Sequence, residues 1–97
     1  MDINELEDAL LGLMKGEHSS LSISLNDQNG PNYMTVKEAI EQSDMFDAGD
    51  WSSEEERQKA IATNRAWTVH WYPDTPVGFY AVHASTLAAA VEAALSQ

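Results

Sequence analysis

Cysteine is absent from this 97-residue chain, and basic side chains are scarce, with five Lys and Arg against sixteen Asp and Glu. The absence of cysteine excludes a disulfide scaffold and thiolate metal sites, and it fits a reducing cytoplasm. The shortage of bases disfavours nucleic acid and anionic membranes as ligands, because both require clustered Lys or Arg. A net charge of −11 favours a basic protein surface as partner, with solubility alone as the alternative explanation.

Long apolar runs and catalytic motifs are also lacking. No stretch approaches the roughly 20 apolar residues that a membrane-spanning helix needs. The first residues, MDINELEDALLGLMKG, are acidic where a secretory signal is basic. The five glycines are scattered, and no Gly-x-Ser-x-Gly elbow is present. We therefore expect a cytoplasmic protein that is neither an enzyme nor dependent on a cofactor.

The pattern of apolar residues predicts a single α+β domain over residues 1–97. Apolar spacings of three and four indicate helices, and strict alternation such as SLSISL indicates strands. The chain is then read as α-β-α-α-β-β-α, with a three-stranded, mostly antiparallel sheet and helices packed on one face. The order of the strands stays open. The expected elements cover about 2–15, 21–25, 35–43 and 53–64, a hairpin within 66–84, and a last helix from 85 or 86.

Capping signals mark the starts of the helices. Asp2 precedes the first helix, and Gly16 is the expected stop. Thr35 stands three residues before Glu38, which is the spacing of a capping box. The side of this second helix that we expect to be buried carries Val36, Ala39 and Ile40.

The stretch DMFDAGDWSSEEE, residues 44–56, is the most acidic part of the chain. An EF-hand loop needs oxygen ligands at every second residue, so acids three apart do not fit one. A looser Ca²⁺ or Mg²⁺ site and a catalytic carboxylate pair remain alternatives. Its SSEEE half is explained locally: Ser52 or Ser53 caps a helix, and acids in the first turn favour the helix dipole.

Acids recur at every third residue before that half, with no base between residues 38 and 56. On a helix, neighbours three apart lie about 5–6 Å apart at Cβ, which is close to the spacing of phosphates along a nucleic-acid strand. We hypothesise an acidic ridge that occupies a phosphate-binding groove of another protein; a merely solvated face is the alternative. The ridge consists of Glu38, Glu41, Asp44, Asp47 and Asp50, extended by Glu54, Glu55 and Glu56.

Histidines and aromatics of the hairpin offer further candidates. His70 and His83 share one face of the sheet if the hairpin loop has four residues, and they lie on opposite faces if it has five. In both cases a joint metal site is not expected. An exposed Tyr72 or Tyr80 would suit a protein interface. The alternative function is therefore a hydrophobic interaction or self-association module, and the chain is expected to be a monomer or a homodimer.

The segment WTVHWYPDTPVGFY, residues 67–80, resembles small acidic proteins of bacteriophages and prophages. The resemblance includes GPNYMTV (30–36) and EERQKA (55–60), and it extends over residues 30–95. Small acidic phage proteins include inhibitors of host defence, among them anti-CRISPR proteins, some of which imitate nucleic acid. The resemblance therefore implies an inhibitor of a CRISPR-Cas-like complex in the host cytoplasm, and it transfers no individual site residue.

Overall fold

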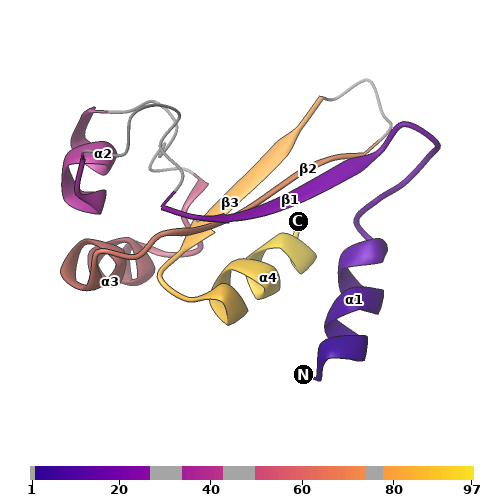
Figure 1. Cartoon of the computed structure of the whole chain (residues 1–97), viewed down its shortest axis with the longest axis horizontal. Coiled ribbons are helices and arrows are strands. Elements are labelled where there is room, and N and C mark those ends of the chain that lie inside the picture. Colours follow the sequence, from indigo (N-terminus) through magenta and orange to yellow (C-terminus); the bar gives the residue numbers. More distant parts are fainter. Residues whose placement is uncertain (1, 27–33, 43–49, 74–77) are drawn as a thin grey trace.

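A computed structural model of the chain describes residues 2–26, 34–42, 50–73 and 78–97. The described elements follow the predicted order α-β-α-α-β-β-α, which confirms the α+β class (Figure 1). The elements are α1 (Ile3–Leu11), β1 (Ser20–Leu25), α2 (Val36–Gln42), α3 (Glu54–Thr63), β2 (Trp67–Tyr72), β3 (Tyr80–Ala84) and α4 (Leu87–Leu95).

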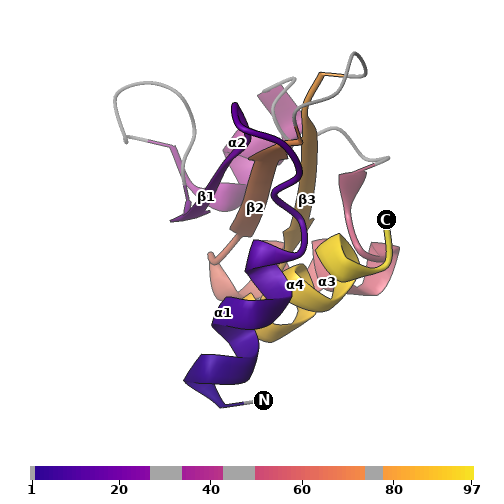
Figure 2. The same cartoon turned by 90° about the vertical axis from the view of Figure 1, so that its right-hand side faces the viewer.

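The three strands form one antiparallel sheet in the order β1-β2-β3. Leu21 pairs with Trp71, and Val69 pairs with both Ile23 and Val82, so these apolar side chains share one face. Alternation along a strand sends every second side chain to the same face. This face packs on α4, with the apolar side of α1 alongside (Figures 1 and 2).

A second, smaller apolar cluster lies at one end of the sheet, where α2 packs against α3 (Figure 1). The predicted buried side of α2 is confirmed: Val36, Ala39 and Ile40 are all buried there. Trp51 completes the cluster from outside the helices. It forms a parallel bridge with His83, and the Ser52 N–H donates to the His83 carbonyl oxygen at 2.9 Å.

The first helix begins as predicted but ends earlier. The Asp2 side chain accepts a hydrogen bond from the Glu5 N–H at 2.8 Å, as an N-cap should. The predicted extension to residue 15, with Gly16 as the stop, is wrong, since α1 ends at Leu11 and Gly12 is its C-cap. Glycine weakens a helix by about 1 kcal/mol relative to alanine, which favours the end at this point. Gly16 instead adopts a φ of 91° in the connection to β1.

Two asparagines join the end of β1 to both helices of the smaller cluster. Asn26 and Asn64 adopt left-handed backbone conformations, with φ of 55° and 53°. The Asn64 side chain accepts from the Val36 N–H and the Asn26 side chain from the Ala66 N–H, both at 2.7 Å. Asn26 Nδ2 donates to the Asn64 carbonyl oxygen at 3.0 Å. These short polar side chains therefore satisfy backbone groups that end or begin regular structure.

The register of the hairpin decides how its histidines lie. Trp71 pairs with Tyr80 and Thr68 with His83, a pairing that matches neither the four-residue nor the five-residue loop. His70 and His83 nevertheless share one face, because Thr68 and His70 are two residues apart on β2. His83 is buried and its Nδ1 is hydrogen-bonded to the Thr68 hydroxyl at 2.8 Å.

Candidate functional surface

The acids of the proposed ridge that lie on α2 point to solvent. Glu38 and Glu41 are exposed because Val36, Ala39 and Ile40 occupy the side of α2 that packs against α3. The predicted capping contact is present, with the Glu38 N–H donating to the Thr35 hydroxyl at 3.1 Å.

The rest of the ridge lies in the acidic stretch that follows. Asp50 is exposed next to the buried Trp51, so its carboxylate belongs to the surface near β3 rather than to α2. Asp44 and Asp47 lie outside the described residues. The structure therefore places three of the five ridge acids at the surface, two of them on one helix.

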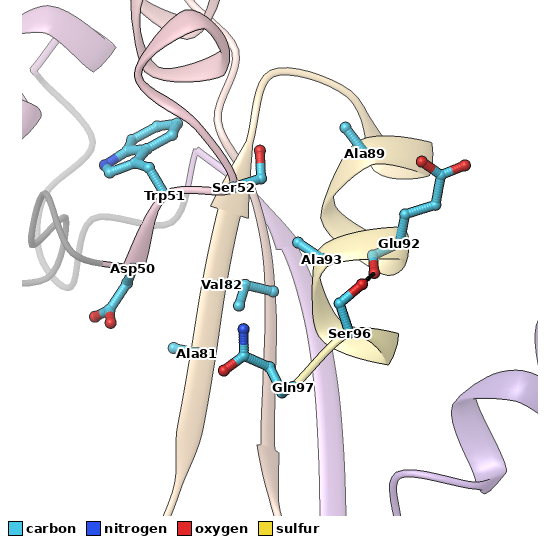
Figure 3. Close-up of a pocket in the computed structure, with 10 residues that line it drawn as sticks. All are labelled: Asp50, Trp51, Ser52, Ala81, Val82, Ala89, Glu92, Ala93, Ser96 and Gln97. Carbon is cyan, nitrogen blue, oxygen red and sulfur yellow. Dashed lines mark hydrogen bonds between the residues drawn. The ribbon is translucent and has the colours of Figure 1, made fainter.

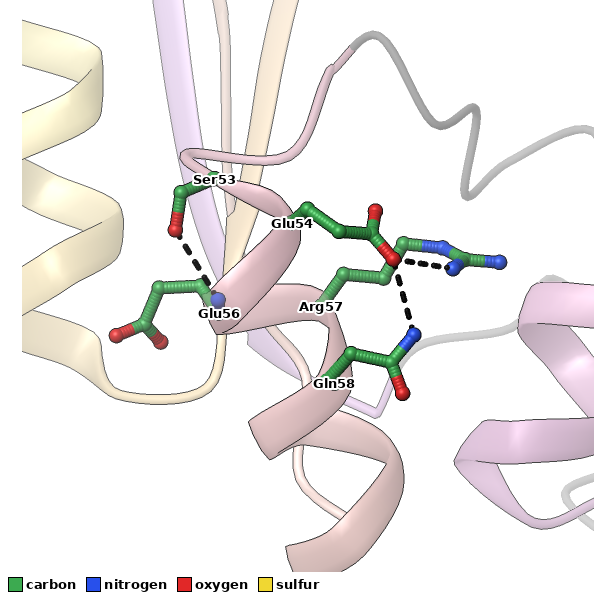
Figure 4. A network of polar contacts seen from close by, with 5 residues as sticks. All are labelled: Ser53, Glu54, Glu56, Arg57 and Gln58. Carbon is green, nitrogen blue, oxygen red and sulfur yellow. Dashed lines mark hydrogen bonds and ion pairs between the residues drawn. The ribbon is translucent and has the colours of Figure 1, made fainter.

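Glu54 and Glu55 make ion pairs within α3. Glu54 Oε1 accepts from Arg57 Nη1 at 3.1 Å and from Gln58 Nε2 at 2.9 Å (Figure 4). The Gln58 hydrogen bond, followed by the Arg57 charge, holds the pKa of Glu54 below its usual value. Glu55 pairs with Lys59 at 3.2 Å. Exposed pairs of this kind contribute little to stability because water and salt screen them, so a basic partner can compete for both carboxylates.

Glu56 has a structural contact that the sequence did not reveal. The Ser53 hydroxyl caps α3 by accepting from the Glu56 N–H at 3.1 Å (Figure 4). The Glu56 side chain turns to the junction of β3 and α4, where it accepts from the Ser85 N–H at 2.9 Å and from the Ser85 hydroxyl. The Ser85 hydroxyl is the main cause that lowers the pKa of Glu56. Glu56 is therefore engaged in holding the fold.

Exposed acids also occur far from the ridge. Within the described residues, eight exposed carboxylates make no side-chain hydrogen bond or ion pair with the rest of the chain. They occupy α1 and the turn after it, α2, the start of residues 50–52 (the Trp51 segment), and α4. These acids are Glu5, Glu7, Asp8, Glu17, Glu38, Glu41, Asp50 and Glu92.

A hollow of about 370 Å³ lies between β3, the Trp51 segment and α4 (Figure 3). Asp50 and Glu92 are its two acids, and Val82 and Ala93 belong to its apolar part. In Figure 3 the two carboxylates lie on opposite sides of the hollow and point away from one another. Paired acid and base catalysis requires carboxylates that converge on one reacting group, so this hollow does not provide it.

The described part of the chain contains no group of three or more His, Asp or Glu side chains arranged to hold a metal ion. In the same residues, no helix has the length and apolar character that a bilayer span requires. Comparison of the chain with protein-family models, curated proteins and solved structures gave no match. What the chain does must therefore be argued from its surface.

Proposed function

We propose that this chain is a non-enzymatic inhibitor that binds a basic, nucleic-acid-recognising surface of a bacterial defence complex of the CRISPR-Cas kind. The observation that carries the proposal is the uncompensated charge of α2: Glu38 and Glu41 are exposed, and neither forms an ion pair within the described residues. The neighbouring α3 adds Glu54 and Glu55, whose exposed pairs are weak. The link to host defence comes from the resemblance of residues 67–80 to phage proteins.

The binding surface in this proposal consists of Glu38, Glu41 and Asp50, with Asp44 and Asp47 between them in sequence. Charges at the rim of an interface act mainly on the rate of association and on the salt dependence. At 0.1 M salt the Debye length is about 10 Å, so exposed charges attract a partner much less than at low salt. Binding to a basic surface should therefore weaken steeply as salt is added.

The test compares two variants that change the net charge equally. Glu38→Lys/Glu41→Lys/Asp50→Lys reverses the described ridge acids, and Glu7→Lys/Asp8→Lys/Glu17→Lys reverses three exposed acids in and after α1. Partners are captured from a bacterial lysate at low and high salt and are then challenged with duplex DNA. We expect the unchanged chain to capture a partner that duplex DNA displaces. The variant with reversed ridge acids (the ridge variant) should fail to capture this partner, and the variant with reversed acids in and after α1 (the α1 variant) should still capture it. Equal losses in both variants would show that only the overall charge matters.

A second candidate function is self-association through an apolar surface, because one such surface is exposed. Ile3 and Leu11 of α1 are 79% and 54% exposed. They line a hollow of about 320 Å³ together with Met14 and Leu21, and its surface is almost entirely apolar. Light scattering should then give a mass well above 10.7 kDa that salt does not reduce. Ile3→Ser/Leu11→Ser should restore the monomer mass, and a monomer at all concentrations would reject this function.

A further inference from the structure

Three aromatic rings gather on the face of the sheet that α4 leaves open. His70 contacts Tyr72 edge-on, with ring centroids 4.9 Å apart, and lies 5.0 Å from the ring of Phe79. The Tyr72 and Phe79 centroids are 5.5 Å apart. Tyr72 is 43% exposed and Phe79 is 58% exposed. We call His70, Tyr72 and Phe79 the aromatic triad.

The triad does not belong to either core. The neighbouring strand places Ser22 opposite His70 and Ser20 opposite Tyr72, and both serines are exposed. Small side chains beside them leave the rings accessible. By contrast, Trp71 and Tyr80 stack at 5.4 Å on the opposite face, where they contact the α4 core. Exposed aromatic side chains that lie together are typical of interaction sites.

The charge of the molecule selects the kind of partner. Stacked nucleic-acid bases would bring phosphates, and anionic lipid would bring headgroup charge, against a chain of net charge −11. A second copy would bring the same −11. A cation is favoured by the overall charge and by the negative faces of the rings alike. None of the five Lys and Arg residues of the chain lies on one of the three described strands, so the sheet itself does not supply a cation to the triad.

We infer that the aromatic triad binds an arginine side chain of the basic partner. A guanidinium group is planar, stays charged and stacks on aromatic faces, which suits rings that are exposed and mutually inclined. The inference rests on the proposed function, since it assumes a basic partner, and it adds a second contact that is apolar as well as electrostatic. The triad supplies a specific contact that a surface of acids alone lacks.

The experiment uses a synthetic peptide of alternating glycine and arginine, with a peptide in which citrulline replaces arginine as the uncharged control. Binding is followed by aromatic NMR of the full chain, with Trp71 and Tyr80 as internal reference rings. We expect the Tyr72 and Phe79 signals to shift with the arginine peptide only. Tyr72→Ala/Phe79→Ala should weaken binding about tenfold, since each exposed ring contributes a few-fold.

A matched control separates this inference from the proposed function. Leu25→Ala/Leu95→Ala removes two exposed apolar side chains that belong to neither proposed surface and should bind like the unchanged chain. If the triad variant binds the arginine peptide as tightly as the unchanged chain while Glu38→Lys/Glu41→Lys/Asp50→Lys loses it, the triad inference fails and the acidic surface stands. Two other results also overturn the triad inference. One is that the citrulline peptide binds as tightly as the arginine peptide. The other is that the chain doubles its mass when the Tyr72 and Phe79 signals shift, so that dimerisation explains the shifts. If the arginine peptide shows no salt-sensitive binding, both the triad inference and the proposed acidic binding surface are rejected.

Discussion

Replacing Glu56 by alanine should destabilise the fold although the side chain looks like one of many surface acids. Its carboxylate accepts two hydrogen bonds from Ser85, which is only 4% exposed. A hydrogen bond to a charged group contributes roughly 1.5–3 kcal/mol, and an unsatisfied buried donor costs about 1–3 kcal/mol. Because Glu56 itself is only partly buried, water can replace some of the lost contact, and we expect a net loss of about 2–3 kcal/mol.

Urea unfolding followed by tryptophan fluorescence measures this loss directly. Glu55→Ala is the matched control, since it removes a neighbouring carboxylate whose exposed Lys59 pair contributes at most about 0.5 kcal/mol. Glu56→Gln retains one acceptor of similar size and should fall between the two. For a domain of this size, the Glu56→Ala loss corresponds to a melting temperature roughly 8–24 °C lower. Equal unfolding free energies for Glu55→Ala and Glu56→Ala would refute the argument that the Ser85 contact holds α3 to the β3–α4 junction.

Three further measurements test other parts of the fold. The Ser85 hydroxyl is the main cause that lowers the pKa of Glu56 in the folded state. The stabilisation by the Glu56 carboxylate is therefore present above the usual pKa of 4.5 and is lost as the pH falls through the folded pKa. The unfolding free energy of Glu56→Gln, measured against pH, should accordingly fall less steeply on the acid side. Asn64→Gly and Asn64→Ala both lose the hydrogen bond to the Val36 N–H, but only glycine tolerates the left-handed backbone at this position. Urea unfolding should therefore show Asn64→Ala to be about 1 kcal/mol less stable than Asn64→Gly. Equal stabilities would contradict the argument from the backbone. Because α1 has no buried residue, its amides should exchange with solvent faster than those of β2, and equal protection would show that α1 is held more firmly than its packing indicates.

Features that depend on neighbours in sequence were the ones that the sequence could predict. Asp2, Thr35 and Ser53 cap their helices as local spacing indicates. The alternation of apolar residues likewise identified the three strands, because the period of two requires no knowledge of the partner strand. The solvent-facing position of Glu38 and Glu41 followed from helical periodicity in the same way.

Features that join distant segments could not be predicted in this way. The sequence explained Glu56 locally, as an acid in the first turn of a helix, but its carboxylate contacts Ser85, 29 residues away. Asn26 and Asn64 lie 38 residues apart and are joined through side-chain and backbone atoms. The sequence indicated only part of the aromatic triad. It offered Tyr72 or Tyr80 as an exposed aromatic residue, and Tyr72 is the exposed one. The place of Phe79 beside it depends on the strand register, which the sequence left open because the length of the hairpin loop was undecided.

The acids of α2 and the aromatic triad lie toward opposite ends of the sheet, whereas Asp50 lies nearer the triad, since it lines a hollow with Ala81, the strand partner of His70. The smaller cluster with α2 and α3 adjoins the start of β2, and the triad lies toward its other end, at Tyr72 (Figure 1). Trp67 and Tyr72, the two ends of β2, lie about 17 Å apart along the strand. Within the described residues, the side chains of Glu38 and Glu41 form no hydrogen bond or ion pair with the triad. Substitutions this far apart normally contribute independently to a free energy. A partner that binds both the α2 acids and the triad must therefore present basic groups at both ends of the sheet, and the losses of affinity in Glu38→Lys/Glu41→Lys and Tyr72→Ala/Phe79→Ala should multiply. A compact basic patch that fits only one of the surfaces would instead leave affinity unchanged when the other is altered.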